Sequence, residues 1–469
     1  MTAIFEKLPL PPVYYHGREA SYWREDDAGG WIKVNETGAK NFAADYGYMK
    51  RTEREANSEA DDCLMRIQSR QNVAYVGSLA GFDAGVYPMS GSLVLVTSSP
   101  KFIKAKAGEW PVLKKLFENM FVDGELDQRP WFYGWIKTAM SSFRARRWRA
   151  SQLLAMAGEH GSGKSLTQNL LTEIFGGRSV KPYRVMSGGT TFNADLFAGE
   201  HLVMEDETES VDIRSRRHFA AHIKSLLASR DQSCHGKHRD ALTLQPIWRM
   251  SISLNEVPER LMVLPPLDDD VRDKIIALKV AKRPTPMPTD TPELAELFWK
   301  KMVSELPAFL AFLESWTIPA DIADSRYGVR AYQNPEIVEK LNELNPEDRL
   351  LEIIDLQFFR NSLCREPWTG TAAELERRLT GDGAKCEREA GRLLGWSAAC
   401  GSYLARLAKS DRLHIAGRVT ARSGGGGIKA WTINPPSAAE PATVVPVTDT
   451  APANPPALPA EVKTKLGLD

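Results

Sequence analysis

A short glycine-rich stretch constrains the fold of this chain more than any other feature. Residues 153–157 are all apolar, Gly158–Ser165 holds three glycines and ends in Gly-Lys-Ser, and residues 167–175 carry a helical pattern. A strand, such a turn and a helix in this order form a phosphate-binding P-loop, because glycines let backbone amides curl around an anion. The stretch predicts an α/β domain that binds a nucleotide.

The P-loop pattern assigns a role to its side chains. Lys164 is expected to reach the β- and γ-phosphates and the Ser165 hydroxyl to ligate Mg²⁺. The helix that follows adds the positive end of its dipole, so ATP and Mg²⁺ are the expected cofactors. The expected nucleotide-binding residues are Gly158, Glu159, His160, Gly161, Ser162, Gly163, Lys164, Ser165 and Leu166.

A second short apolar run, His201–Met204, leads into a group of carboxylates. An ATPase needs one acid at such a strand end to hold Mg²⁺ and another to polarise the attacking water. Asp206 is expected to hold the metal and Glu207 to act as the base. Glu205 competes for one of these roles, since neighbours on a strand point to opposite faces. A solvated acidic loop is the alternative interpretation.

Two further elements belong to the same stretch of chain. Residues 251–254 predict a strand that ends in Asn255, whose amide is expected to contact the attacking water and the γ-phosphate. Upstream, residues 230–240 predict a hairpin with a cationic tip that contacts a phosphate backbone, although an exposed loop would show the same composition. The tip residues expected to bind DNA are Lys237, His238 and Arg239.

The remaining chain divides by composition into further parts. Residues 106–150 predict two helices and end in the basic cluster 143–149 around Trp148, which suits either nucleic-acid contact or a cationic last helical turn. The expected domains are 1–105, a small α+β module of unassigned role; 106–150, a helical collar; 151–283, the ATPase core; 284–345, a helical lid and linker; 346–433, a small separate domain; and 434–469, a disordered Pro/Ala-rich tail.

Residues 346–433 show the pattern of a winged helix. Two helices are expected at 371–379 and 397–410, and two strands at 413–419 and 428–433, around a glycine-rich turn. Ser402 and Tyr403 would lie on the second helix and Arg418 on the wing. Winged helices bind duplex DNA or other proteins, so both alternatives stay open. The residues expected to bind DNA are Arg406, Lys409 and Arg422.

Bulk composition fits this organisation. The chain has 469 residues, with 60 basic and 60 acidic side chains, so a DNA contact requires a local basic patch or a pore. Its five cysteines are scattered and predict neither disulfides nor a metal site. No apolar run approaches the length of a membrane span, and the expected location is the cytoplasm.

The P-loop, acidic strand, basic hairpin and terminal Asn255 together resemble the superfamily 3 helicases of the AAA+ class, and most of all the helicase modules of phage, plasmid and satellite primase-helicases. The resemblance implies an AAA+ core and a ring, often a hexamer, that translocates on single-stranded DNA in a bacterial host cell. It also implies that an arginine in the segment 264–275, Arg272 being favoured over Arg249 and Arg260, acts on the nucleotide of the neighbouring subunit.

The expected DNA partner of such a helicase is single-stranded or forked DNA. A primase or initiator would be a separate chain, because the first hundred residues lack a clustered acidic metal site. The alternative function is a non-translocating ATPase switch, such as a replication initiator or helicase loader. A small-molecule kinase is a third class, which rarely needs a sensor asparagine or a winged helix.

Overall fold

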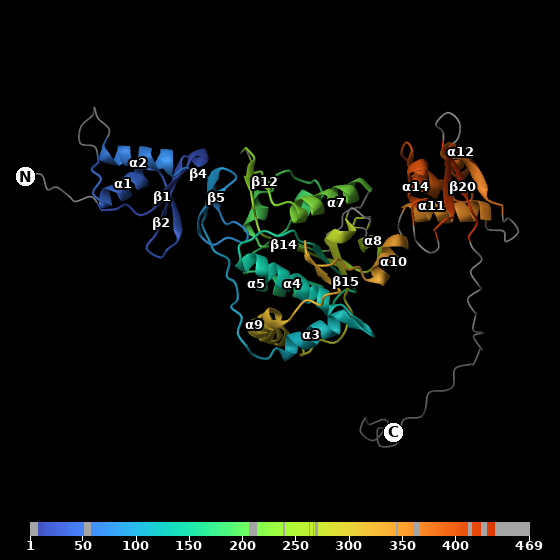
Figure 1. The fold of residues 1–469 in the computed structure, drawn as a ribbon, viewed down its shortest axis with the longest axis horizontal. Coiled ribbons are helices and arrows are strands. Elements are labelled where there is room, and N and C mark those ends of the chain that lie inside the picture. Colours follow the sequence, from blue (N-terminus) through green and yellow to red (C-terminus); the bar gives the residue numbers. More distant parts are fainter. Residues whose placement is uncertain are drawn as a thin grey trace, which may run out of the picture. The chain divides into compact units, whose positions relative to one another are not determined.

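The computed structural model describes residues 8–50, 58–205, 213–237, 240–261, 263–265, 267, 271–343, 346–359, 366–410, 415–423 and 429–436. The chain forms two compact units, Met1–Asn345 and Pro346–Asp469 (Figure 1). Asp206, Glu207, His238 and Arg239 lie outside the described residues, as does the tail from 437 onward.

The first unit begins with an antiparallel sheet covered by two helices. Its strands are β1 (Val13–His16), β2 (Ser21–Glu25) and β3 (Trp31–Val34), in the order β1-β2-β3. Helices α1 (Glu36–Asp45) and α2 (Glu59–Arg70) each begin at a side-chain cap, Asn35 and Ser58 respectively. A separate small core, which includes Val13, Tyr22 and Leu64, holds these elements together.

A second three-stranded sheet connects this part to the rest of the unit. It consists of β4 (Val73–Gly77), β5 (Gly85–Met89) and β6 (Ser92–Val96), in the order β4-β6-β5. Val94 and Val96 belong to the same hydrophobic cluster as strands of the central sheet. Residues 73–96 therefore share a hydrophobic core with the central sheet.

A five-stranded parallel sheet forms the centre of the first unit, which confirms the expected α/β core. Its order is β10-β11-β14-β9-β15, and neighbouring strands are parallel throughout. The strand bounds are β9 (Leu153–Gly158), β10 (Ser179–Val180), β11 (His201–Met204), β14 (Arg249–Asn255) and β15 (Ile275–Lys279).

Helices cover both faces of this sheet, as Figure 1 shows for α7 and α5. Alternate residues of β9 face opposite sides, so that Leu153 and Ala155 join one hydrophobic cluster while Leu154 and Met156 join the other. One layer holds α7 (Ile213–Ala228), α8 (Pro258–Leu261) and α10 (Pro335–Glu343); the other holds α3 (Pro111–Phe121), α4 (Arg129–Arg144), α5 (Lys164–Ile174) and α9 (Pro292–Ser315).

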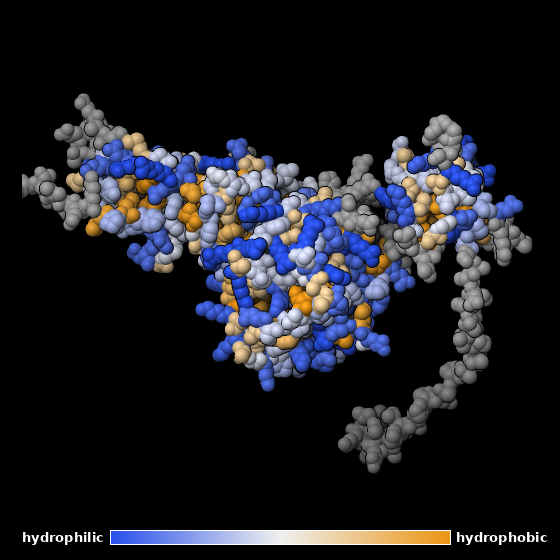
Figure 2. Space-filling view, in the orientation of Figure 1, coloured by the Kyte–Doolittle hydropathy of each residue, from blue (hydrophilic) through white to orange (hydrophobic). Residues whose placement is uncertain are grey.

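Short elements complete the first unit. They are η1 (Gly17–Glu19), β7 (Val122–Asp123), β8 (Leu126–Asp127), α6 (Tyr183–Met186), η2 (Ala194–Ala198), β12 (Gln232–Cys234), β13 (Leu242–Leu244), η3 (Arg272–Lys274), β16 (Ala323–Asp324) and β17 (Gly328–Val329). On the face drawn in Figure 2, hydrophilic residues predominate over the central region and the apolar patches are small and separate. Among the described residues, no helix is long and apolar enough to cross a membrane.

The second unit combines helices with a three-stranded sheet of order β18-β20-β19. Its elements are α11 (Pro346–Ile354), the π-helical turn η4 (Asp355–Phe359), β18 (Trp368–Thr371), α12 (Ala372–Thr380), α13 (Glu387–Leu393), α14 (Ala399–Leu407), β19 (Val419–Ser423) and β20 (Lys429–Ile433). Helix α12 begins at a capping box formed by Thr371 and Glu374, which is the start expected from the sequence.

The first strand of the C-terminal hairpin differs from its expected position. A strand was expected over residues 413–419, whereas β19 begins at Val419. Gly417 has a φ of +74°, which turns the chain, and the Arg418 guanidinium is bound by the Asp355 carboxylate and the Asn434 carbonyl. These contacts fix residues 415–418 as a turn.

Candidate nucleotide-binding site

The P-loop joins the buried strand β9 to helix α5 through a turn that requires glycine. Gly161 and Gly163 have φ values of +78° and +90°, in the left-handed region where a side chain is strained. A Cβ on Gly158 would lie 2.3 Å from the carbonyl oxygen of Val280. Each glycine of the motif is thus required, two by backbone conformation and one by close packing.

The N-terminus of α5 presents amide groups to the loop. Gly163 caps the helix and no side chain accepts a hydrogen bond there. The first backbone hydrogen bond of the helix is donated by Thr167, so the amides of Lys164, Ser165 and Leu166 point toward the loop. A helix start whose amides lack a side-chain acceptor, directly after a glycine-rich turn, suits the phosphates of a nucleotide.

The Lys164 side chain lies against the P-loop. Its Nζ donates to the carbonyls of Gly158 and Glu159, at 2.7 Å each, and lies 3.2 Å from the Ser162 Oγ. The ammonium is therefore held at the mouth of the P-loop. Ser165 is exposed in the first turn of α5, where its hydroxyl can ligate a metal ion, and Glu159 and His160 are exposed on the loop.

A second cation, which the sequence did not indicate, lies beside the P-loop. The Nζ of Lys282 lies 3.5 Å from the Glu159 carboxylate, and its Cε is 4.0 Å from the place of a Cβ on Gly161. Lys282 follows β15, which pairs with β9, so strand pairing brings it beside the P-loop. Its signal in the sequence is only a lysine soon after an apolar run.

The carboxyl ends of three parallel strands meet at the P-loop edge of the sheet. In the β9–β14 pairing, Asn255 lies directly opposite Gly158, and the β11–β14 pairing sets Met204 opposite Ile252. Nucleotides bind at this edge of open α/β sheets. Glu205 follows β11 and its carboxylate lies 3.0 Å from the Lys181 Nζ. Asp206 and Glu207 come next in the chain, outside the described residues.

A buried ring of hydrogen bonds beneath the P-loop links α5 to β11 and β14. Gln168 Nε2 donates to the Ser251 Oγ at 2.9 Å, and Ser251 contacts the His201 Nε2 at 2.8 Å. His201 Nδ1 lies 2.8 Å from the Thr172 Oγ1, which in turn donates to the Gln168 carbonyl. A second hydrogen bond from Gln168 Nε2 goes to the Met204 carbonyl.

This ring, formed by Gln168, Thr172, His201 and Ser251, has one consistent direction of donation. Because the Thr172 proton goes to the Gln168 carbonyl, Thr172 accepts from the His201 Nδ1, and the Nε2 accepts from Ser251. Burial lowers the pKa of His201 to about 3, which keeps the ring neutral. The ring fixes the P-loop helix against β11, which Glu205 follows, and β14, which ends in Asn255. Sequence reasoning missed it, since its members show no common motif.

Arg272 lies at the opposite edge of the sheet from the P-loop. It opens η3, immediately before β15, and Ile275 at the start of β15 pairs with Leu153 at the start of β9. Its Nε is 3.3 Å from the Gln333 Oε1, and Gln333 donates back to the Arg272 carbonyl. The structure therefore does not bring Arg272 and Lys164 of one chain together.

Strands β12 and β13 form the expected hairpin, with Cys234 opposite Leu242. The Asn193 side chain holds its first strand by bonding the Ser233 carbonyl and the His235 amide. Arg18 of η1 donates to the Asp240 carbonyl at 2.9 Å, so the N-terminal part of the unit contacts the base of this loop. Lys237 is exposed in the turn, and the two tip residues after it lie outside the described part.

In the second unit, the residues expected to bind DNA occupy different environments. Lys409 and Arg422 are exposed, whereas the Arg406 Nη1 lies 3.5 Å from the Glu347 carboxylate. Tyr403, expected on the binding helix, is buried, and Arg418 is bound by Asp355. Tyr403 and Arg418 therefore support the fold, and they are not available to a ligand.

The chain is similar to one family model and to several solved structures. A family of unknown function, DUF5906, matches residues 156–272, from β9 to Arg272. No curated protein matches the chain. The A form of the apo NrS-1 C-terminal region is similar over 90% of this chain and 96% of that chain, with a TM-score of 0.50 and 12% identity. The SCCmec type IV Cch active helicase is similar over 86% of this chain and 73% of that chain, with a TM-score of 0.31 and 12% identity. The likeness to NrS-1 shows a shared fold.

Proposed function

We propose that this chain is an ATP-dependent DNA helicase of the superfamily 3 type, within the AAA+ class, that serves replication of a phage or mobile element. The observation that carries the proposal is the strand register that sets Asn255 opposite Gly158, at the edge where Lys164 begins α5. A P-loop with a polar residue at the end of the neighbouring strand suits coupling of nucleotide state to movement. A kinase would not need the basic hairpin that precedes β14.

The proposal gives each site residue a role, with Asp206 and Glu207 assigned from the sequence alone. Mg²⁺ and ATP, when bound, supply the phosphoryl group and the charge that neutralises it. Lys164 and the first amides of α5 bind the phosphates, while Ser165 and Asp206 hold the metal ion. Glu207 accepts a proton from the attacking water, and Asn255 orients that water.

A ring of six copies gives Arg272 its role. In one chain Arg272 lies at the sheet edge away from Lys164, so its guanidinium can stabilise the γ-phosphate only in a neighbouring copy. Such a finger supplies roughly 10³–10⁵ in rate in well-studied enzymes. The arrangement makes hydrolysis dependent on assembly.

The hairpin β12–β13 is proposed to contact single-stranded DNA in the pore through Lys237, His238 and Arg239. Residues 346–433 form a winged-helix domain in this proposal and bind forked or duplex DNA through Lys409, Arg422 and Arg406. A primase or initiator on another chain would complete the system. These contacts explain how a chain with zero net charge can hold DNA.

Strand displacement on a forked DNA substrate with Mg²⁺ and ATP tests this function. The wild-type chain, the Lys164→Ala variant and a triple variant neutralising Lys237, His238 and Arg239 are compared, with ATP binding and ATP hydrolysis measured in parallel. Unwinding that is lost in both variants, with ATP binding lost only in Lys164→Ala, is the expected result.

The same assay separates the alternative function. DNA-stimulated ATP hydrolysis without strand displacement would assign the chain to the non-translocating switches, such as an initiator or loader. Absence of any response to DNA would refute both proposals. Sedimentation of the chain with and without ATP analogue tests the hexamer independently.

A further inference from the structure

A pocket of about 720 Å³ lies at the end of α4, away from the P-loop. It is formed where the segment after α4 meets the end of α7 and the turn between β16 and β17. Its lining is basic and hydroxylic, with one aromatic side chain. The lining residues used below are Ser142, Arg147, Trp148, Arg149 and Arg326.

The arginines of this pocket differ in how many hydrogen bonds and ion pairs they form with the rest of the protein. Among the described residues, none forms an ion pair or side-chain hydrogen bond with the exposed guanidinium of Arg147. Arg149 donates from Nε and Nη2 to carbonyls of the β16–β17 turn, at 3.0 Å to Arg326 and 2.7 Å to Ser325. The Arg326 Nη1 lies 3.9 Å from the Asp273 carboxylate, and its guanidinium lies 4.9 Å from the centre of the Tyr327 ring. The pocket therefore keeps an excess of positive charge.

A buried arginine behind the pocket adds to this charge. Arg249 is 2% exposed, and its guanidinium donates to the Trp248 carbonyl at 2.8 Å and to the Ser142 Oγ at 2.9 Å. Within the described part of the chain, no carboxylate pairs with it. Burial and the nearby charge of Arg149 lower the pKa of Arg249 to about 9, so it stays protonated at neutral pH.

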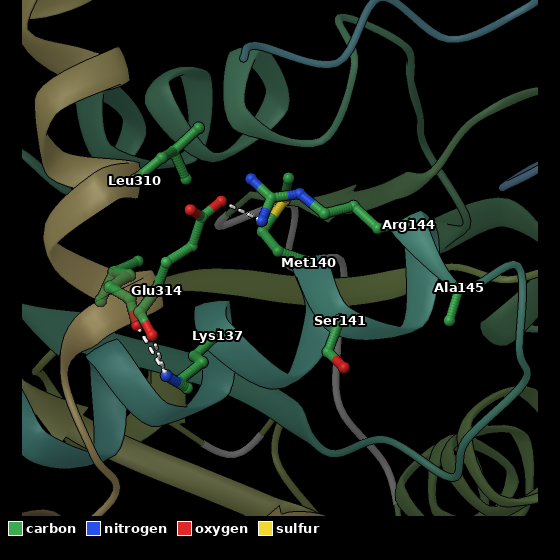
Figure 3. Close-up of a pocket in the computed structure, with 8 residues that line it drawn as sticks. Lys137, Met140, Ser141, Arg144, Ala145, Leu310 and Glu314 are labelled. Atoms are coloured by element: carbon green, nitrogen blue, oxygen red, sulfur yellow. Dashed lines mark hydrogen bonds and ion pairs between the residues drawn. The ribbon is translucent and has the colours of Figure 1, made fainter. Parts of the chain in front are cut away.

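A neighbouring pocket on α4 serves as a comparison, because its basic side chains have partners within the protein. This pocket of about 420 Å³ lies between α4 and α9 (Figure 3). Its Lys137 Nζ donates to three carbonyls at the end of α9, from 2.6 to 3.0 Å, and its Arg144 pairs with Glu314. Both cations there have partners within the protein, in contrast to the guanidinium of Arg147, which has none among the described residues.

We propose that the pocket lined by Ser142, Arg147, Trp148 and Arg149 binds a phosphate of single-stranded nucleic acid, with the adjoining base stacked on Trp148. A buried cation without a counter-ion is costly, and a phosphate bound at the pocket reduces that cost. Ser142 links the pocket wall to Arg249, because its oxygen accepts from that guanidinium while its proton goes to the Thr138 carbonyl at 3.1 Å.

The size and composition of the pocket favour a nucleotide unit of a polymer. Its volume exceeds what one phosphate needs and falls within the range of about 300–1,000 Å³ typical for organic ligands. A half-buried indole beside guanidinium groups is the combination that single-strand binding proteins use, stacking the base and pairing the backbone. This choice of polymer rests on the proposed function, in which the ATPase acts on DNA.

The test measures binding of a fluorescein-labelled oligothymidylate by anisotropy, using the full chain with an ATP analogue. Arg147→Glu is expected to weaken binding roughly tenfold, and Arg147→Ala to lower the slope of log affinity against log salt by about 0.7. Trp148→Ala is expected to weaken binding by roughly fivefold or more. The matched control is Lys114→Glu, an exposed lysine of α3 outside the pocket.

A direct readout locates the contact. An oligonucleotide carrying 5-iodouracil is irradiated in complex with the protein, and the cross-linked peptide is identified by mass spectrometry. Cross-linking to the peptide that contains Trp148 supports the proposal. Thermal denaturation of each variant shows whether it is folded, and Arg147, being exposed, is expected to tolerate substitution.

Each other outcome overturns the inference. Unchanged affinity in folded Arg147→Glu and Trp148→Ala, beside wild-type DNA binding, would refute the pocket and leave the helicase proposal intact. Binding of thymidine monophosphate or inorganic phosphate as tightly as the polymer would make this a small-anion site. If the wild-type chain hydrolyses ATP but binds no DNA, the pocket and the helicase proposal both fall, whereas the ATPase remains.

Discussion

The buried ring beneath the P-loop gives a quantitative prediction for Ser251→Ala. The Ser251 hydroxyl accepts from the Gln168 Nε2 and donates to the His201 Nε2, and both partners are at most 1% exposed. Its removal leaves one donor and one acceptor buried without partners. Each such group costs about 1–3 kcal/mol, so we expect the free energy of unfolding to fall by about 3 kcal/mol.

Ser253→Ala is the matched control on the same strand. Ser253 is also buried, at 4% exposed, but its hydroxyl has no hydrogen-bond partner among the described residues. We expect its loss to change the free energy of unfolding by less than about 1 kcal/mol. Equilibrium urea unfolding followed by far-ultraviolet circular dichroism measures both variants.

The double variant His201→Phe with Ser251→Ala sharpens the test. Replacing both polar partners by apolar groups leaves fewer orphaned atoms than removing one, so the double variant should be more stable than the sum of single effects predicts, by about 1 kcal/mol or more. Equal effects of Ser251→Ala and Ser253→Ala, or strict additivity in the double variant, would refute the ring as a stabilising unit.

Three further predictions concern protonation, the loop and the subunit contact. His201 has a pKa of about 3 in the folded chain against 6.5 for the free group, so the unfolded chain takes up the proton first and stability falls as pH drops from 6.5 toward 3. The loss is about 1.4 kcal/mol per pH unit, and urea unfolding of His201→Phe across this range should show a shallower dependence. Gly158→Ala should abolish ATP binding in a fluorescent-nucleotide titration, because the added Cβ would lie 2.3 Å from a backbone oxygen. The control is Gly177→Ala, where no atom lies within 4 Å of the added Cβ, and this variant should retain ATP binding despite some backbone strain. Arg272→Ala should bind ATP without hydrolysing it, and mixing it with Lys164→Ala should restore part of the hydrolysis if the two residues meet across subunits; no restoration at any mixing ratio would contradict that role.

The local features of this protein were readable from its sequence. Glycine at 158, 161 and 163 and the lysine after them specify a turn and a helix start through φ angles and Cβ clashes, which involve few neighbouring residues. The buried strand β9 and the capped start of α12 followed from hydrophobic pattern and capping residues in the same way. Steric limits and capping hydrogen bonds depend on residues close together in the chain, so the sequence alone determines these features.

The remaining features depend on which distant residues the sheet brings together. Strand pairing sets Asn255 opposite Gly158, and helix packing closes the ring of Gln168, His201 and Ser251. Register and packing depend on all the strands at once, and no local pattern encodes them. Arg249 illustrates the difference. From the sequence alone an arginine is expected to be exposed, whereas the tertiary structure buries Arg249 behind Ser142, with no carboxylate beside it among the described residues. Its charge there adds to that of the neighbouring pocket.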